Sequence, residues 1–185
     1  ASSSMETWSP THVGSFGAGR IATSIAIGLE HVCVLLDDGT ISCWGAGGYG
    51  QLGDGTGIGR SYPAPTSSLG TGRSAVAIAS GYQHTCAILD DGSVSCWGRN
   101  TGNGYLGDGT STNRYAPTQT ASLGTNRTAV AISADLHTCV VLDNGGISCW
   151  GHGYSGRLGN GGNADSNVPT LATNLTNSRT AVAIS

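Results

Sequence analysis

Apolar and polar residues alternate in one stretch that the chain repeats three times, with a period of about 53 residues. The copies are residues 31–45 (HVCVLLDDGTISCWG), 84–98 (HTCAILDDGSVSCWG) and 137–151 (HTCVVLDNGGISCWG). In each copy, two short runs rich in β-branched residues flank Asp-Asp-Gly or Asp-Asn-Gly, which are turn sequences typical of β-hairpins. The pattern therefore predicts three hairpins.

The hairpin turn also predicts which residues face each other. A three-residue loop that ends in a left-handed Gly39 sets Leu36 opposite Thr40 and, further along the ladder, Cys33 opposite Cys43. Such a pair has its Cα atoms about 4.5 Å apart, which is within the range of a disulfide bond. The same register pairs Cys86 with Cys96 and Cys139 with Cys149, so that all six cysteines are used.

Two other uses of these cysteines stay open at this point. A metal site could form from the His-x-Cys step and the second cysteine of a hairpin. However, the two-residue spacing of zinc knuckles is missing, and each hairpin offers only three ligands. The cysteines could also be free, buried thiols. Of the three interpretations of these cysteines, we favour disulfide bonds.

The segments between the hairpins repeat as well. Four Pro-Thr elements each end in arginine and precede a short apolar strand. They occupy residues 10–20, 65–73, 117–127 and 169–179, and the strands occupy residues 25–27, 75–79, 129–133 and 181–185. About four short strands per repeat, without the apolar spacing of a helix, predict an all-β protein. We expect a β-propeller with four-stranded blades, in which three repeats and a partial unit at each end form an open arc or part of a ring.

This reading divides the chain into two regions. Residues 1–9 are predicted to be an N-terminal extension, and residues 10–185 are predicted to be propeller repeats. The repeats contain the three hairpin cores and a partial unit at residues 169–185.

Composition and charge exclude several functions. The chain has no lysine, its eight arginines are outnumbered by eleven acidic residues, and its formal net charge is −3. A nucleic-acid-binding surface would need a basic patch, so we predict no nucleic-acid partner. Schiff-base and P-loop chemistry need a lysine. The aspartates fit hairpin turns and glycine-rich loops, and no Ser-His-Asp arrangement is visible, so we predict no enzyme activity and no cofactor. No apolar run is long enough to span a membrane.

Regularly paired cysteines indicate an oxidising compartment, such as the cell exterior, the cell surface or a virion. In a eukaryotic secretory route, Asn126 and Asn174 would stand in N-glycosylation sequons.

Three residue types recur at fixed places in the repeat, and we interpret them as structural. The tryptophans are expected to wedge between blades because an aromatic side chain buries a large area. The histidines are expected to hydrogen-bond a neighbouring loop, and the arginines to anchor loop carbonyls. These residues are Trp44, Trp97 and Trp150; His31, His84 and His137; and Arg20, Arg73, Arg127 and Arg179.

A binding site is expected where the copies differ, which is at the start of the long glycine-rich connections after each hairpin. These connections are residues 46–62, 99–115 and 152–167. They contain tyrosine, arginine and histidine at positions that change from copy to copy, and tyrosine and arginine are favoured in recognition hot spots. The candidate partner-binding residues are Tyr49, Arg99, Tyr105, His152 and Tyr154.

The second hairpin is followed by Arg99-Asn100 and then by Leu106-Gly107-Asp108-Gly109. This pattern resembles the regulator of chromosome condensation repeat family, and the resemblance extends over nearly the whole chain from about residue 10. It implies a β-propeller of four-stranded blades, typically a seven-bladed ring. The chain departs from the family pattern in having a cysteine pair in every hairpin and only three units with an overhang. The cysteine pairs favour an extracellular branch of the family.

We therefore predict a non-enzymatic extracellular recognition or structural module. It would bind a protein or glycan through its inter-strand loops, or form part of a cell-surface or virion appendage. Self-assembly, or completion of a blade by another chain, would cover the ends of the arc. Within the resemblance, a secreted bacterial β-lactamase inhibitor is a precedent for protein binding outside the cell. The alternative is guanine nucleotide exchange or chromatin regulation, as in the family's nuclear members.

Overall fold

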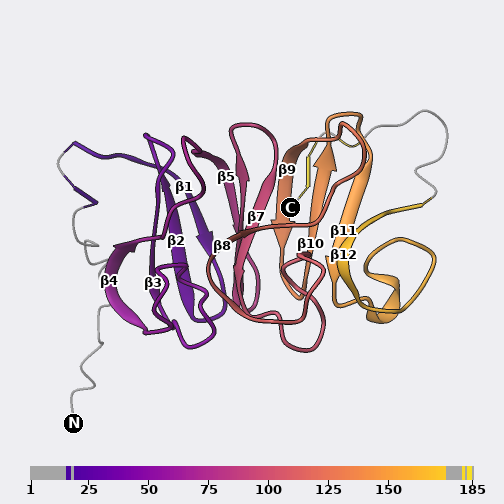
Figure 1. Cartoon of the computed structure of the whole chain (residues 1–185), viewed down its shortest axis with the longest axis horizontal. Coiled ribbons are helices and arrows are strands. Elements are labelled where there is room, and N and C mark those ends of the chain that lie inside the picture. The colour runs from indigo at the N-terminus through magenta and orange to yellow at the C-terminus, as the bar shows by residue number, and fades with distance from the viewer. Residues whose placement is uncertain (1–15, 18, 174–180, 182, 185) are drawn as a thin grey trace, which may run out of the picture.

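The computed structural model describes residues 16–17, 19–173, 181 and 183–184. Within these residues, twelve strands form three antiparallel four-stranded sheets, and each sheet takes its strands in chain order (Figure 1). The first sheet contains β1 (Ala22–Ile27), β2 (His31–Leu36), β3 (Ile41–Gly45) and β4 (Arg60–Pro65). The second contains β5 (Ala75–Ser80), β6 (His84–Leu89), β7 (Val94–Gly98) and β8 (Arg114–Gln119). The third contains β9 (Ala129–Ala134), β10 (His137–Leu142), β11 (Ile147–Gly151) and β12 (Ser166–Leu171), and a 3₁₀ turn, η1, covers Tyr154–Gly156.

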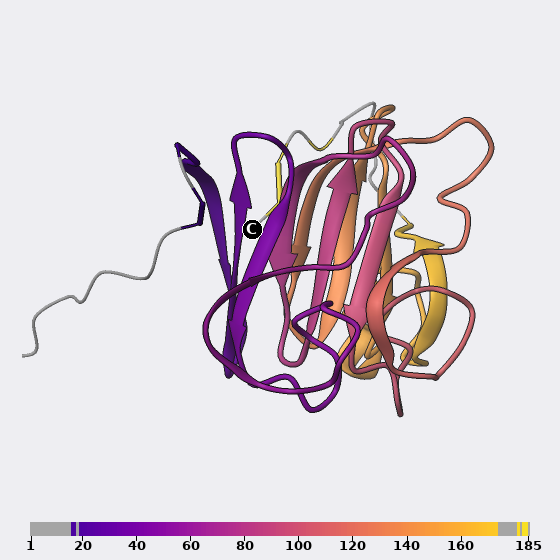
Figure 2. The same ribbon diagram turned by 60° about the vertical axis from the view of Figure 1, so that its left-hand side comes forward.

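The three sheets stand side by side as the blades of an arc (Figure 1), and Figure 2 shows the same order from another side. The first strand of each sheet makes the contact between blades, because β5 packs against β1 and β2, and β9 packs against β5 and β6. The fourth strand of each sheet is an outer edge and contains a proline, which is tolerated at an edge because it needs no ladder hydrogen bond. These prolines include Pro63, Pro117 and Pro169. The described part of the chain is thus an arc of propeller blades, as the repeat pattern predicts, and it forms no closed ring by itself.

The hairpins have the predicted register and cross-links. Cys33 lies opposite Cys43, and the Leu36 amide donates to the Thr40 carbonyl at 2.9 Å. Gly39 closes the turn in the left-handed region, with φ at +77°, where glycine has no steric penalty. Every cysteine is in a disulfide bond within its own hairpin, with the two Cα atoms 4.1 Å apart.

The hydrophobic core lies between blades. One cluster joins the first two sheets and contains the Cys33–Cys43 disulfide, Leu89 and Trp97. Trp97 and Trp150 are both 0% exposed, and their indole N–H groups donate to the carbonyls of Gln51 and Tyr105 in the preceding blade, at 3.1 and 3.0 Å. The prediction that these tryptophans wedge between blades is confirmed. Trp44 has the same place in the first sheet, but there it faces outward and is only half-buried.

The histidines bridge blades through a strand, whereas a loop was predicted. His31 Nε2 lies 2.8 Å from the Thr85 hydroxyl on β6, and His84 Nε2 lies 2.8 Å from the Thr138 hydroxyl on β10. The predicted partner was wrong because sequence alone does not show which strand of the next sheet faces the histidine.

The recurring arginines also have partners other than the predicted carbonyls. Arg20, Arg73 and Arg127 pair with aspartates of the hairpin turns, at the end of the blades away from the long connections. The N–O distances range from 2.8 Å for Arg20–Asp38 and Arg73–Asp91 to 3.1 Å for Arg127–Asp143. The prediction of carbonyl partners was wrong, because the turn carboxylates offer a charged acceptor nearby.

Several predicted regions lie outside the described residues. They are the extension at residues 1–9, the start of the first Pro-Thr element, Asn174, Arg179 and most of the last partial unit. Residue 181 is described, and its amide donates to the Gly145 carbonyl at 3.0 Å. Ala75 and Ala129 make the same hydrogen bond to the turns before them. Residue 181 therefore occupies the place where an inner strand begins.

Candidate functional site

The long connections of the three blades gather on one face of the arc, at the lower edge of Figure 1. We call this face, made of residues 46–59, 99–113 and 152–165, the loop face. In the first connection, Asp54 accepts hydrogen bonds from the amide and hydroxyl of Thr56 at 3.0 and 2.7 Å. Its other carboxylate oxygen accepts two more bonds from Arg60, at 2.9 and 2.8 Å. Burial raises the pKa of Asp54, but these hydrogen bonds outweigh burial and hold the pKa below its usual value.

The second connection repeats this structure, and the third does not. Asp108 accepts bonds from Thr110 at 2.9 and 2.7 Å and from Arg114 at 2.7 Å. In the third connection Asn160 stands at the aspartate position, and Ser166 stands at the arginine position. Two of the three connections are therefore fixed internally by a charged group.

Each of the first two connections also forms hydrogen bonds with the next blade. The Gly55 amide donates to the Tyr115 carbonyl at 2.8 Å, and the Gly109 amide donates to the Asn167 carbonyl at 2.8 Å. Gly104 has φ at +74°, and a Cβ there would lie 2.5 Å from Asn167 Cα. This close approach requires glycine. The loop face is thus tied to the outer strands, which gives it a defined shape.

Arg99 lies at the centre of the loop face, between two tyrosines from different blades. Its guanidinium carbon is 5.5 Å from the ring centroid of Tyr49 and 6.0 Å from that of Tyr105. These distances are in the range of cation–π contacts. One guanidinium nitrogen donates to Gln83 Oε1 at 2.9 Å. The buried Nε has no hydrogen-bond partner among the described residues.

A chain of polar contacts leads from this cluster to the third blade. The Tyr105 hydroxyl donates to Asn103 Oδ1 at 2.6 Å, and the Asn103 amide nitrogen donates to Asp165. Asp165 also accepts a bond from the Gly153 amide at 2.8 Å. Burial raises the pKa of Tyr105 further above neutral pH, in keeping with a protonated hydroxyl that donates.

His152 and Tyr154 lie next along this face. Their rings stack with centroids 6.1 Å apart, and Arg157 Nη1 lies 2.9 Å from His152 Nδ1. Tyr154 is exposed.

The structure thus places all five predicted residues on the loop face, in two groups. Arg99 contacts both Tyr49 and Tyr105, whereas His152 and Tyr154 form a separate pair. Tyr105 is only 8% exposed, and its carbonyl accepts the Trp150 indole bond, so it also holds blades together. Whether these residues bind a partner stays a prediction.

Sequence reasoning missed four residues that take part in these contacts. They are Gln83, Asn103, Arg157 and Asp165. A signal existed for Arg157 alone, because Gln51, Tyr105 and Arg157 occupy the same place in the recurring Gly-x-Leu-Gly step. Gln83, on the turn between β5 and β6, and Asn103, in the same connection as Tyr105, join the cluster only through side-chain hydrogen bonds. Asp165 joins it from the third blade.

The buried histidines are not suited to acid–base chemistry near neutral pH. Burial lowers the pKa of His31 to about 4. Burial and the neighbouring His31 and His137 lower the pKa of His84 to about 3. In the described ranges, His, Cys, Asp and Glu side chains do not gather in threes in a way that could hold a metal ion. The helical segments of the described residues include none with the length and apolarity needed to cross a bilayer.

Comparison with known proteins gives a consistent result. Two profiles of the regulator of chromosome condensation (RCC1) repeat match the chain, one at residues 22–51 and 75–104 and the other at residues 38–88 and 144–185. The human E3 ubiquitin-protein ligase HERC2 is 35% identical over 152 residues, which is 79% of this chain and 3% of HERC2. The Arabidopsis thaliana ultraviolet-B receptor UVR8 is 28% identical, with 88% of this chain and 36% of the receptor covered.

Among solved structures, Prp20p from Saccharomyces cerevisiae superimposes with a TM-score of 0.72 at 24% identity, covering 83% of this chain and 39% of Prp20p. This likeness shows the fold. The chain spans only a small part of HERC2 and about a third of UVR8. The two profiles together match more than half of the chain, and its three blades have the four-stranded build that the repeat implies. The chain belongs to the regulator of chromosome condensation (RCC1) repeat family.

Proposed function

We propose that this chain is a non-enzymatic partner-binding module that holds a protein on its loop face, with Arg99 at the centre of the contact. The arrangement of Arg99 between Tyr49 and Tyr105 carries this proposal. Arginine and tyrosine are the residue types that dominate binding energy at protein interfaces. The Arg99 side chain is half-buried, with Nε inside and one terminal nitrogen on Gln83, so a carboxylate of the partner would accept from the terminal nitrogens of the guanidinium.

The rigidity of the loop face supports the same function. The Asp54 and Asp108 networks and the contacts with the outer strands fix the loops before any partner arrives. A surface that is already ordered loses less conformational entropy on binding. Prp20p itself binds Gsp1p and histones. This supports a protein as the partner class, although it says nothing of which protein this chain would bind.

The disulfides support a location in an oxidising compartment, on the cell exterior, the cell surface or a virion. Three disulfides occur within an arc of only three blades, and reducing compartments rarely maintain such bonds. A thiol titration of the unfolded, unreduced protein tests this. We expect no free thiol, whereas six free thiols per chain would favour a reducing compartment.

The alternative function is guanine nucleotide exchange on a small GTPase or chromatin regulation. Family membership favours it, while the net charge of −3 does not favour chromatin contact. Release of fluorescent GDP from a small GTPase, measured with and without the chain, tests exchange directly. Accelerated release would support the alternative, and unchanged release would argue against exchange on the GTPase tested.

The loop-face proposal is tested by binding the labelled chain to arrays of extracellular proteins and of glycans. We expect protein binding that falls at least tenfold in Arg99→Ala, the loss typical of a hot-spot residue. Arg73→Ala is the matched control, because Arg73 is an exposed arginine at the opposite end of the blades. Unchanged binding in a Tyr49→Ala, Arg99→Ala double variant would overturn the proposed site. Binding to glycans alone would overturn the proposed partner class.

A further inference from the structure

The two interfaces between blades use one repeated set of hydrogen bonds. The Thr85 hydroxyl donates to the Gln51 carbonyl at 3.0 Å and lies 2.8 Å from His31 Nε2. A hydroxyl has one hydrogen to donate, so Thr85 accepts its second bond from the His31 Nε2–H group. Thr138 meets His84 and the Tyr105 carbonyl in the same way, at 2.8 and 3.4 Å. Each interface therefore needs a histidine donor on one blade and a threonine acceptor on the next.

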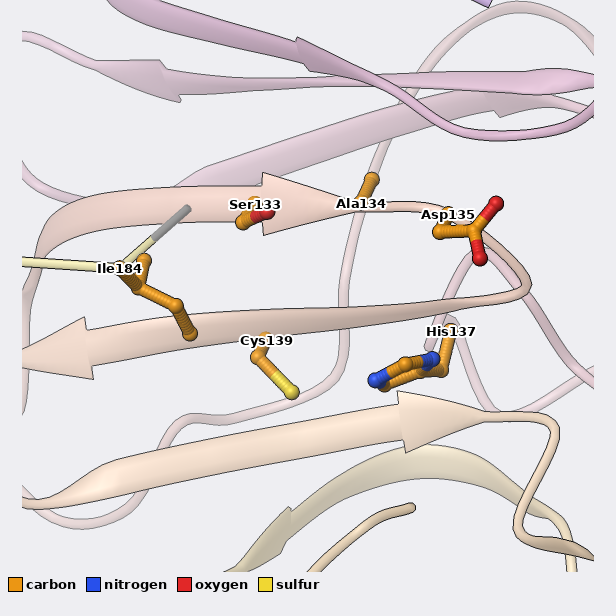
Figure 3. A pocket seen from close by; sticks show the side chains of 6 residues that line it. All are labelled: Ser133, Ala134, Asp135, His137, Cys139 and Ile184. Carbon is orange, nitrogen blue, oxygen red and sulfur yellow. The ribbon is translucent and has the colours of Figure 1, made fainter. Parts of the chain in front are cut away.

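The outer face of the third sheet presents the histidine half of this interface. His137 and Cys139 line an open pocket of about 250 Å³, together with Ile184 from the start of the next inner strand. Figure 3 shows His137 and Cys139 along one strand, with Ile184 beside them. The position matches that of His31 and Cys33, which both approach the Thr85 hydroxyl. This face is thus complementary to a blade that carries threonine.

The outer face of the first sheet presents the other half of the interface, the one on which Thr85 and Thr138 lie in the later sheets. Val32 pairs with Trp44 in the strand register, just as Thr85 pairs with Trp97. The remaining apolar parts of the interface are present, since Trp44 contacts Phe16 with ring centroids 6.5 Å apart, and Ile25 is 60% exposed. The apolar part of the interface is therefore kept, while the hydroxyl acceptor is replaced by a methyl group.

This replacement determines which partner fits the face. A blade with histidine at the usual position would bury an Nε2–H donor against Val32. A buried donor without an acceptor costs considerably more than its hydrogen bond would contribute. An apolar side chain at the same position would instead pack against the Val32 methyl groups.

We propose that the face of the first sheet binds a repeat blade whose side chain at the histidine position is apolar. Continuity with the two described interfaces supports a blade as the occupant. A second copy of this chain fits less well, because its third sheet would bring His137 against Val32.

The test joins an extra blade, a copy of residues 66–118, ahead of residue 12 of the chain, in register with the repeat. Four fusions combine the histidine or a His84→Leu substitution in the added copy with Val32 or Val32→Thr in the recipient sheet. Urea unfolding gives the stability of each fusion. With Val32 we expect the leucine copy to be more stable, by roughly tenfold in the unfolding equilibrium constant. With Val32→Thr we expect the histidine copy to be the more stable of the two.

The interface between the second and third sheets shows how much the histidine–threonine pair contributes to stability. In the unfused chain, His84→Leu and Thr138→Val should each destabilise, and the double variant should recover part of the loss. Hydroxyl-radical footprinting of Trp44 shows whether the added blade docks, and we expect oxidation of Trp44 to fall in the leucine fusion. Two results would overturn the proposal. One is a histidine copy that is at least as stable as the leucine copy beside Val32. The other is oxidation of Trp44 that stays the same in all four fusions.

Discussion

The Thr85 hydroxyl of the second blade contacts three groups of the first blade. Thr85 is fully buried, and its oxygen bonds the His31 ring and the Gln51 carbonyl, while Cys33 Sγ lies 3.7 Å away. The Trp97 indole shares the same carbonyl at 3.1 Å. Every donor here has an acceptor, which avoids the larger cost of a buried, unpaired N–H or O–H group. The one buried atom of this set without a partner among the described residues is the acceptor His31 Nδ1.

Replacing Thr85 by valine should therefore destabilise the chain although the two side chains have similar shapes. The change leaves the buried His31 Nε2–H without an acceptor, for which we expect a loss of about 1–3 kcal/mol in the free energy of unfolding. Urea unfolding measures this loss. Thr125→Val, at an exposed turn, is the matched control and should change stability by no more than about 0.5 kcal/mol. Equal stabilities of the two variants would contradict the role assigned to Thr85.

The buried histidines also predict a dependence of stability on pH. Burial lowers the pKa of His31 to about 4 and that of His84 to about 3, whereas an unfolded chain protonates histidine near pH 6.5. Between these values the unfolded state binds more protons, so stability decreases as the pH falls. We expect each of the two histidines to remove about 1–2 kcal/mol by pH 5.

Unfolding by urea at pH 7, 6 and 5 checks this dependence. His84→Gln should reduce the dependence because it removes one of the two buried titrating groups. His152→Gln on the loop face is the comparison for a histidine outside the core. A pH dependence in His84→Gln as steep as that of the unchanged chain would show that the buried ring does not cause it.

At the scale of elements, the hairpins could be predicted from sequence, and the contacts between blades could not. Every determinant of a hairpin lies within one short stretch, so turn type and alternation are enough to place Cys33 opposite Cys43. The partner of His31 is Thr85, 54 residues further along the chain. Finding it requires knowing how one sheet turns relative to the next.

The candidate site shows the same limit. The variable residues of the connections could be identified by comparing the copies. Asp165 could not, since it reaches the cluster from the third blade, and Gln83 could not, since it lies on the turn between β5 and β6, 16 residues before Arg99. The arginines of the Pro-Thr elements were identified as structural, but their carboxylate partners lie on the hairpin turns that follow them in the sequence. Spacing alone did not distinguish these partners from nearby carbonyls.

The disulfides should contribute unequally because their surroundings differ. The Cys86–Cys96 bond lies in the core between the second and third sheets, whereas the Cys139–Cys149 bond lies at the outer face of the third sheet. Closing a loop of about 11 residues contributes about 2.5–3 kcal/mol in the chain-entropy model. We expect at least this loss when Cys86 and Cys96 are both changed to alanine, since packing between blades is lost as well.

The same double change at Cys139 and Cys149 is the matched control. It removes an equal loop closure with less packing, so its loss in the free energy of unfolding should be smaller. Unfolding in urea under non-reducing conditions gives both values. A loss at the third hairpin that equals or exceeds that at the second would contradict this account of the core.

At the scale of the whole molecule, the arc has two unlike ends. An interface that joins the first sheet of one copy to the third sheet of another would be head-to-tail, and such interfaces extend into rings or open filaments. Repeated blades are prone to this association because each end resembles half of an internal interface. Self-assembly of this chain stays a prediction, and Val32 opposes its head-to-tail form.

Val32→Thr should increase head-to-tail association, since it supplies the acceptor that His137 of a second copy needs. A gain of one satisfied buried donor corresponds to roughly a tenfold lower dissociation constant. Sedimentation velocity over a range of concentrations measures the change. Val130→Thr is the matched control, because Val130 is 58% exposed on the inner strand β9. Its counterpart in the middle sheet, Val76, is equally exposed, so this position lies outside the contacts between blades. When combined with Val32→Thr, His137→Leu should abolish the gain in association because it removes the donor at the new contact. Thr85→Val should not abolish it because it leaves that donor in place. If Val32→Thr and Val130→Thr associate equally, the ends of the arc do not recognise each other through this pair of residues.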